Sequence, residues 1–358
     1  MLQQLFAISR NTFVESIRQP IFSVMIFFAW LVLIVLNPSM SAYSMEHGAD
    51  VQMLITMGLS TVAVMTLLLA AFTATGVIAE EIERKTVLTV VSKPVGRPLF
   101  ILGKYLGVAA ATTLAYYLMA VILLLTYRHG VMSTASDHFD QPVWTFAALG
   151  VLAALGVAVT TNYLYRWVFT STFVLAAAAT MTLALLMVAV ISPQWTLQSP
   201  LADLASDDWR GAQLLVGLGV VFEAMLILTA AAVACSTRLG RVPTLLICIV
   251  LFLLGLTSNS LSGLVNKWMS VPQSAGLFES LTAIWHAQQS AGLKIVCFAL
   301  KGVYMIVPNL QFLWPGEAIF QGHPFTLTLI AKMSLYAAMH IIIALCIAVM
   351  LFQRREVG

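Results

Sequence analysis

Long apolar runs, separated by short polar segments, follow one another along most of this 358-residue chain. A run of about 20 residues, folded as an α-helix, is long enough to cross roughly 30 Å of hydrocarbon. The pattern therefore predicts an all-α chain with about eight transmembrane helices. We place these helices near residues 21–36, 53–79, 99–127, 143–164, 168–191, 214–235, 242–257 and 327–352.

Residues 1–20 have an amphipathic pattern ahead of the first apolar run. Arg10 and Glu15 lie mostly on the polar face, and a helix of this kind is expected to lie on the membrane surface. A signal peptide is the alternative, but its charged region would be unusually long and further apolar runs follow it. The apolar positions of this helix are Leu2, Leu5, Phe6, Phe13 and Ile17.

Residues 259–326 leave the regular pattern before the last apolar run. Apolar side chains recur at helical spacing from Leu293 to Val307, while Lys294 and Lys301 fall on another face. We expect an extracytoplasmic segment with an interfacial or re-entrant helix, whose lysines reach the headgroups. A ninth transmembrane helix is disfavoured because it would move the basic C-terminus to the outside.

Composition excludes an ordinary soluble domain. Hydrophobic residues make up 60% of the chain, charged residues 9%, and the mean hydropathy is +0.94, whereas soluble domains are roughly 25% charged. We therefore interpret residues 21–358 as one polytopic transmembrane domain. The net charge of +3 gives no indication of nucleic-acid binding. The four cysteines lie in or beside apolar runs without Cys-x-x-Cys spacing, so we expect neither disulfides nor a metal site.

The distribution of basic residues predicts the orientation. Loops on the side of the N-terminus hold twelve of the 18 Lys and Arg residues, and the other side holds six. The positive-inside rule then predicts a multi-pass protein of the cell membrane with both termini in the cytoplasm. The twelve are Arg10, Arg18, Arg84, Lys85, Lys93, Arg97, Lys104, Arg166, Arg238, Arg241, Arg354 and Arg355.

Charge is concentrated in residues 80–104, between the second and third apolar runs. Solvation alone needs far fewer charges, so we expect this cytoplasmic loop to contact something in the aqueous phase. The loop closes with Gly103 and Lys104, which open the third run. Its charged and turn-forming residues are, in order, Glu80, Glu81, Glu83, Arg84, Lys85, Thr86, Ser92, Lys93, Pro94 and Arg97.

The order of these residues resembles the first cytoplasmic loop of ABC-2 type exporter permeases. The resemblance implies that the loop carries a coupling helix, which docks on a separate ATPase subunit. That ATPase would bind ATP and Mg, so this chain is expected to need no cofactor of its own. A second permease subunit, identical or different, is also implied. The family's common core has six transmembrane helices, so we assign the extra pair to the middle of the chain.

Other functions are less well supported by the sequence. No Gly-x-x-x-x-Gly-Lys-Ser/Thr loop is present, so ATP hydrolysis through that motif is excluded. An intramembrane glutamate protease is one alternative, but the arginine of its motif is one position out of place at Arg84, and histidines at a suitable depth are missing. An ion-driven secondary transporter is another, but it would need several acidic groups near the midplane. The loop itself could also merely anchor to anionic lipid.

Glu223 is the one acidic residue deep within a predicted transmembrane helix. An ionised carboxylate at that depth costs about 2.5 to 3.5 kcal/mol on insertion scales, so the side chain should face the bundle or a wet cavity. It is a candidate for the pathway of an exported substrate. The alternative is an interhelical hydrogen bond to a polar residue such as Asn162.

Overall fold

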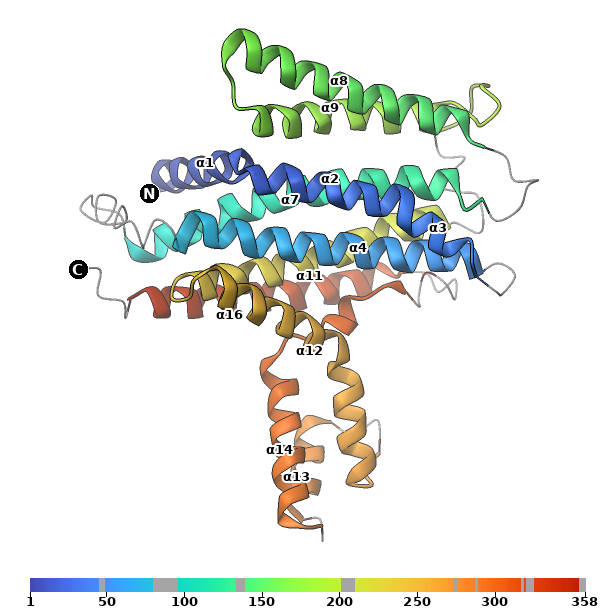
Figure 1. Ribbon diagram of the computed structural model, residues 1–358. Helices are drawn as coiled ribbons and strands as arrows, with labels where there is room; N and C mark the ends of the chain where they lie inside the picture. Colours follow the sequence, from blue (N-terminus) through green and yellow to red (C-terminus); the bar gives the residue numbers. More distant parts are fainter. Residues whose placement is uncertain are drawn as a thin grey trace.

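The computed structural model describes residues 1–44, 49–79, 96–132, 139–200, 210–272, 276–286, 289–316, 319 and 325–353. Within these ranges the chain is helical apart from its connections and one isolated bridge between Ile191 and Leu197 (Figure 1). The elements are α1 (Leu2–Arg18), α2 (Pro20–Leu31), the π-helix η1 (Val32–Leu36), α3 (Asn37–Ser41), α4 (Ala49–Ala74), the π-helix η2 (Thr75–Ala79), α7 (Arg97–His129), α8 (Gln141–Tyr165), α9 (Phe169–Val190), α11 (Arg210–Ser236), α12 (Arg241–Trp268), α13 (Leu277–His286), α14 (Ala291–Ile306), the 3-10 helix η4 (Leu310–Leu313) and α16 (Leu327–Gln353).

The predicted all-α polytopic architecture is confirmed. Among the described residues, eight helices are long and apolar enough to cross a membrane, and each corresponds to one predicted apolar run. The first is continuous through α2, η1 and α3. The seventh, α12, continues eleven residues beyond the predicted end at residue 257. The beginning of α1, the end of α16 and the beginning of α7 lie at the same end of the bundle (Figure 1).

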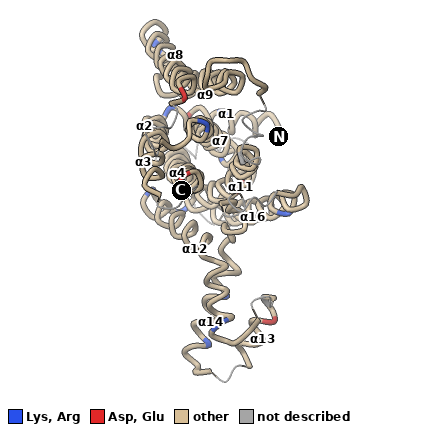
Figure 2. The backbone as a smooth tube through the Cα atoms, turned by 90° about the vertical axis from the view of Figure 1, so that its right-hand side faces the viewer, with Lys and Arg blue, Asp and Glu red and all other residues tan. Residues whose placement is uncertain are grey.

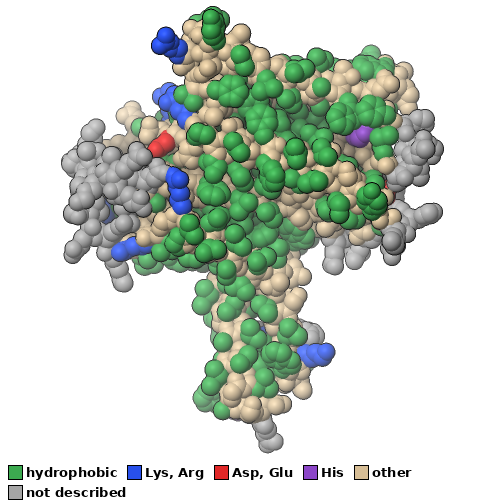
Figure 3. Space-filling view, in the orientation of Figure 1, with side chains coloured by type: hydrophobic (Ala, Val, Ile, Leu, Met, Phe, Trp, Pro, Cys, Tyr) green, Lys and Arg blue, Asp and Glu red, His purple; other side chains and the backbone are tan. Residues whose placement is uncertain are grey.

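Three helices make the centre of the bundle. α4, α7 and α11 run side by side and bury most of their side chains, while α8, α9, α12 and α16 bury only a minority. Seen along the helices, α8 and α9 lie on one side of this centre, and a lobe projects from the opposite side (Figure 2). Hydrophobic side chains cover most of the visible bundle surface, as expected for contact with lipid (Figure 3).

The α8–α9 hairpin turns within three residues. Arg166 adopts a left-handed conformation (φ 56°) at the C-cap of α8. The Asn162 side-chain amide donates a hydrogen bond to the Trp167 carbonyl at 2.6 Å, which closes the turn. The connection between the two helices is therefore short and carries one basic residue, Arg166. Because its amide is used locally, Asn162 is not the partner of Glu223.

The lobe consists of the second half of α12 together with α13 and α14 (Figures 1 and 2). It has a small core of its own, in which Val265, Ile284 and Cys297 are fully buried. Lys301 points into the lobe and donates to Ser262 Oγ at 2.8 Å and to Asn266 Oδ1 at 2.9 Å.

The expectation that Lys301 reaches the headgroups is therefore wrong, because polar groups of α12 hold its ammonium inside the lobe. Burial lowers the pKa of this ammonium from its ordinary value of 10.5. Lys294 differs, since its ammonium donates to the exposed Trp285 carbonyl at 3.1 Å.

Candidate functional site

The loop that the sequence singles out lies mainly outside the described residues. Residues 80–95 lie outside the described ranges, and they include the predicted coupling residues Glu80, Glu81, Glu83, Arg84, Lys85, Thr86, Ser92, Lys93 and Pro94. The structure does describe both stems of the loop. The incoming stem is η2, which ends at Ala79, and the outgoing stem is α7, which begins at Arg97.

The N-terminal helix α1 and the residue after it contact both stems. A Cβ atom added at Gly76 of η2 would lie 2.7 Å from the Gln19 side-chain nitrogen. On α7, a Cβ atom at Gly103 would lie 2.7 Å from the Ile8 side chain, and one at Gly107 would lie 2.6 Å from the Ser9 carbonyl oxygen. These glycines allow the closest approach of the N-terminal segment to the two stems. The N-terminal segment is therefore in close contact with both stems.

The packing of α1 refines the amphipathic interpretation of residues 1–20. Ile17 and Thr12 are buried, whereas Leu2 and Phe6 remain largely exposed. The face next to α7 therefore includes small and polar residues as well as apolar ones. Part of the predicted apolar face stays available for other contacts.

The incoming stem is fully buried and is not a regular α-helix. All five residues of η2 are buried, and Thr75 donates its hydroxyl hydrogen to the Ala71 carbonyl at 2.8 Å. Single π-helical turns inside α-helices occur frequently at functional sites. The turn here lies immediately before the charged loop.

The outgoing stem carries a buried lysine. Lys104 is only 2% exposed, and its ammonium lies 4.0 Å from a Glu15 carboxylate oxygen of α1. The same ammonium lies 5.6 Å from the centre of the Phe100 ring. The ion pair between Glu15 of α1 and Lys104 of α7 thus adds an electrostatic attraction to the close packing of these two helices.

Two arginines, one on the outgoing stem and one after α11, bind the end of the last helix. Arg97 donates to the Gln353 carbonyl at 2.9 Å, and Arg238, just after α11, donates to the Leu351 carbonyl at 2.9 Å. Carbonyls at a helix C-terminus lack intrahelical partners, and cations there are favoured by the helix dipole. The Phe100 and Phe352 rings stack with centroids 5.6 Å apart. Arg97, the one predicted coupling residue described, therefore joins α7 to α16.

Glu223 lies between α11 and α16. The Ser334 hydroxyl of α16 donates to Glu223 Oε1 at 2.5 Å. Glu223 Oε2 is buried and has no hydrogen-bond partner in the described part of the chain. The sequence did not indicate Ser334, because one hydroxyl in an apolar helix gives no pattern. An interhelical hydrogen bond is present, but with Ser334 and not with Asn162.

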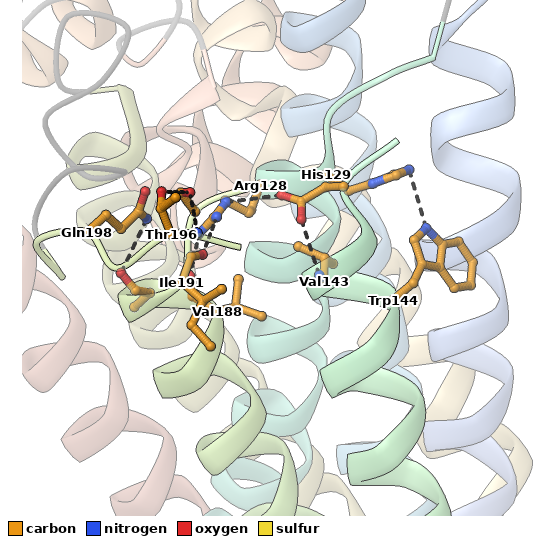
Figure 4. A network of polar contacts seen from close by, with 11 residues as sticks. Arg128, His129, Val143, Trp144, Val188, Ile191, Thr196 and Gln198 are labelled. Carbon is orange, nitrogen blue, oxygen red and sulfur yellow. Dashed lines mark hydrogen bonds and ion pairs between the residues drawn. The ribbon is translucent and has the colours of Figure 1, made fainter. Parts of the chain in front are cut away.

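A polar network that the sequence analysis missed lies at the opposite end of the bundle (Figure 4). Arg128 Nε lies 3.2 Å from Asp140 Oδ2, and both side chains are at most 10% exposed. The remaining guanidinium nitrogens donate to the carbonyls of Val188 and Ile191 at 2.5 and 2.8 Å. Asp140 Oδ1 accepts from the Val143 amide and so caps α8. One arginine thereby joins α7 to both helices of the hairpin.

An apolar pocket of about 350 Å³ lies near this network, between the first transmembrane helix, α7 and α8. Its few polar groups include the His129 ring, whose Nε2 accepts from Trp144 Nε1 at 3.4 Å (Figure 4). Such a pocket suits an apolar ligand better than a charged one. In the described ranges, no group of three His, Cys, Asp or Glu residues is placed to hold a metal ion.

The fold and these sites define a multi-pass membrane protein. Polar contacts connect its transmembrane helices at both ends of the bundle. The family model described as ABC-2 family transporter protein matches residues 6–202, more than half of the chain. The chain belongs to this family and is an ABC transporter permease, a membrane-spanning subunit and not itself a catalytic enzyme. Neither the curated proteins nor the solved structures provide a match. The protease and the secondary transporter are not favoured.

Proposed function

We propose that this chain is the permease subunit of an ATP-driven exporter and that residues 80–95 dock on a separate ATPase subunit. The observation that carries the proposal is the contact of one N-terminal segment with both stems of the charged loop. A displacement of the loop would be passed to α4 through η2. It would be passed to α7 through Arg97, the first residue of that helix. Both helices belong to the buried centre of the bundle.

The stems support motion of rigid helices and not local bending. Closely packed residues resist compression, so a displacement is passed on through contacts. When the ATPase closes on ATP, the loop is displaced, and α1, α4 and α7 move together. Arg97 passes the motion to α16 through the Gln353 carbonyl. In this proposal the partner ATPase binds ATP and Mg, and this chain binds no cofactor of its own.

The proposed assembly contains a second permease subunit, a copy of this chain or a related one. Large apolar side chains on α16, including Leu335, Met339 and Ile342, are more than half exposed. A second permease or lipid would cover this surface. The substrate is exported along a pathway to which Glu223 is proposed to contribute, since one of its carboxylate oxygens has no partner among the described residues.

Charge reversal in the loop tests the docking. The Arg84→Glu, Lys85→Glu double variant should lose its co-purifying ATPase in mild detergent but keep the melting temperature of the permease. Exposed charges contribute roughly 0 to 1 kcal/mol to stability, which explains the second expectation. The matched control is Lys267→Glu with Lys294→Glu, which makes the same change of charge on the lobe.

The control should retain the ATPase. Normal ATPase recovery with the loop variant would contradict the docking. Equal loss from both double variants would show that charge in general, and not this loop, holds the partner.

A further inference from the structure

The seam between the α8–α9 hairpin and the rest of the bundle contains a second pocket, at the end opposite to Arg128. Its volume is about 540 Å³, and it lies beside the junction of α1 and α2 and the α8–α9 turn. Arg18 and Arg166 line it together with the hydroxyl residues Ser171 and Thr172. Basic side chains are visible at this end of the molecule (Figure 3). The pocket thus has two arginine side chains in its lining, whereas the apolar pocket at the other end has no Lys or Arg among the described residues that line it.

The charge of this pocket is not balanced by the residues around it. None of the described residues that line it is acidic. Both arginines are exposed, and neither guanidinium has an ion pair or hydrogen bond with another described residue. Two guanidinium groups that face one pocket without a carboxylate favour a ligand with a phosphate or another oxyanion.

The backbone adds to this preference. Val168, the N-cap of α9, provides no side-chain cap, so the first amides of α9 are not satisfied by a capping side chain. The Ser171 and Thr172 hydroxyls both donate back to the Val168 carbonyl at 3.0 Å. The positive end of the helix dipole therefore lies at the same pocket as the two arginines.

The other wall of the pocket is apolar. Val157 of α8 and Leu175 and Ala176 of α9 continue from the basic end along the hairpin. Trp167, which also lines the pocket, is 57% exposed at the turn, and tryptophan is enriched where headgroups meet hydrocarbon. A free phosphate ion would use the arginines but not the apolar wall. A phospholipid would use both.

The hairpin is attached unequally at its two ends. At the outer end, Arg128 binds Asp140 and two carbonyls of α9. At the inner end, the direct polar contact that the structure describes is the Thr170 hydroxyl, which donates to the Arg18 carbonyl at 3.0 Å. A phosphate between Arg18 and Arg166 would join the hairpin to the α1–α2 junction at this end.

We infer that this pocket binds an anionic phospholipid of the inner leaflet, with the phosphate between Arg18 and Arg166 and an acyl chain along Val157 and Leu175. Basic pockets between transmembrane helices on the cytoplasmic side suit such headgroups. The bound lipid completes the attachment of the hairpin to the bundle. This role is independent of ATPase docking.

Native mass spectrometry of the purified full chain tests the inference. Phosphatidylglycerol and phosphatidylcholine with identical acyl chains are titrated against the wild type and the Arg18→Gln, Arg166→Gln double variant. We expect the wild type to prefer phosphatidylglycerol and the variant to bind it roughly 10- to 30-fold more weakly, the loss expected for two basic groups at an anionic surface. Arg10→Gln with Lys267→Gln removes the same charge from exposed positions outside the pocket and should bind like the wild type.

Thermal unfolding of the wild type provides a readout that needs no variant. Phosphatidylglycerol should raise the melting temperature more than phosphatidylcholine does. Equal binding of the two lipids, or equal loss in the control variant, would overturn the site. Displacement of phosphatidylglycerol by millimolar inorganic phosphate would show that the pocket binds a free anion. It would overturn the inference that the ligand is a lipid.

Discussion

Arg128, next to the last residue of α7, lies 3.2 Å from Asp140, the residue that caps α8, and both side chains are almost fully buried. The same guanidinium also binds two carbonyls at the end of α9. These contacts make Arg128 the main polar attachment of the hairpin to the bundle at this end. The charge is stabilised because each of the three guanidinium nitrogens has an acceptor.

Removal of the arginine should therefore be costly. Arg128→Met leaves Asp140 buried without its partner, and loss of one member of a buried pair costs about 3 to 5 kcal/mol. Thermal unfolding in detergent should show a large fall in melting temperature. Asp140→Asn should cost less, because its amide oxygen can still accept from the Val143 amide. Arg10→Met, at an exposed position, is the control, and a similar fall there would contradict the assigned role of Arg128.

Gly107 tests the contact between α1 and the outgoing stem. Gly107→Ala would place a methyl group against Thr12 and the Ser9 carbonyl, and overpacking of this kind costs about 1 to 3 kcal/mol. The same substitution at Gly156 meets nothing within 4 Å and should be neutral or slightly stabilising, since alanine favours helix. The measurements are melting temperature and recovery of the ATPase.

We expect Gly107→Ala to lower both quantities and Gly156→Ala to change neither. A Gly107→Ala variant that is less stable but still retains the ATPase would separate packing of α1 from coupling, and the proposed transmission through α1 would be wrong.

Glu223 tests the contact between α11 and α16. Glu223→Gln keeps an oxygen that can accept from the Ser334 hydroxyl, so its melting temperature should match that of the wild type. Glu223→Leu removes the oxygen that accepts from the Ser334 hydroxyl. The loss of this hydrogen bond should lower the free energy of unfolding by about 1 to 3 kcal/mol. Ser334→Ala should behave like Glu223→Leu.

The pathway hypothesis adds a second readout to the same variants. If the carboxylate serves the exported substrate, Glu223→Gln should lower ATP hydrolysis by the assembled transporter in membranes without changing the melting temperature. Normal hydrolysis by Glu223→Gln, together with reduced stability of Glu223→Leu, would leave a purely structural role.

The proposed orientation can be tested by thiol labelling. The four native cysteines are first replaced, because Cys346 is exposed on the helix surface. Single cysteines at positions 133 and 211 should then react with an impermeant reagent in intact cells. A cysteine at position 95 should react only after permeabilisation. Twelve of the 18 basic residues are predicted on the same side of the membrane as this position, and the positive-inside rule assigns that side to the cytoplasm. Labelling of position 95 in intact cells would reverse the orientation and remove the docking proposal.

The transmembrane helices could be predicted from the sequence because length and hydropathy are local signals. The end of α12 could not be predicted from these local signals. Polar residues after position 257 end the apolar run, but the helix continues to Trp268 because Ser262 and Asn266 find a partner in Lys301. That partner lies 35 residues beyond Asn266 in the chain, so no local pattern reveals it.

The polar contacts were equally hard to predict. The pairing of Arg128 with Asp140 depends on how three helices meet, which no local sequence pattern reveals. Ser334 was not recognised at all. By contrast, the loop between residues 80 and 95 was identified from charge density alone, and the N-terminal segment packs against both of its stems.

The short turn at Arg166 bears on how the protein is made. α8 and α9 pack mainly against each other, and three residues join them. Helices that emerge in succession from the ribosome can pair as soon as both are in the lipid, because in the membrane association follows insertion. We therefore expect the two helices to leave the translocon as a finished pair, before α11 has been synthesised. The bundle would then assemble against a preformed unit.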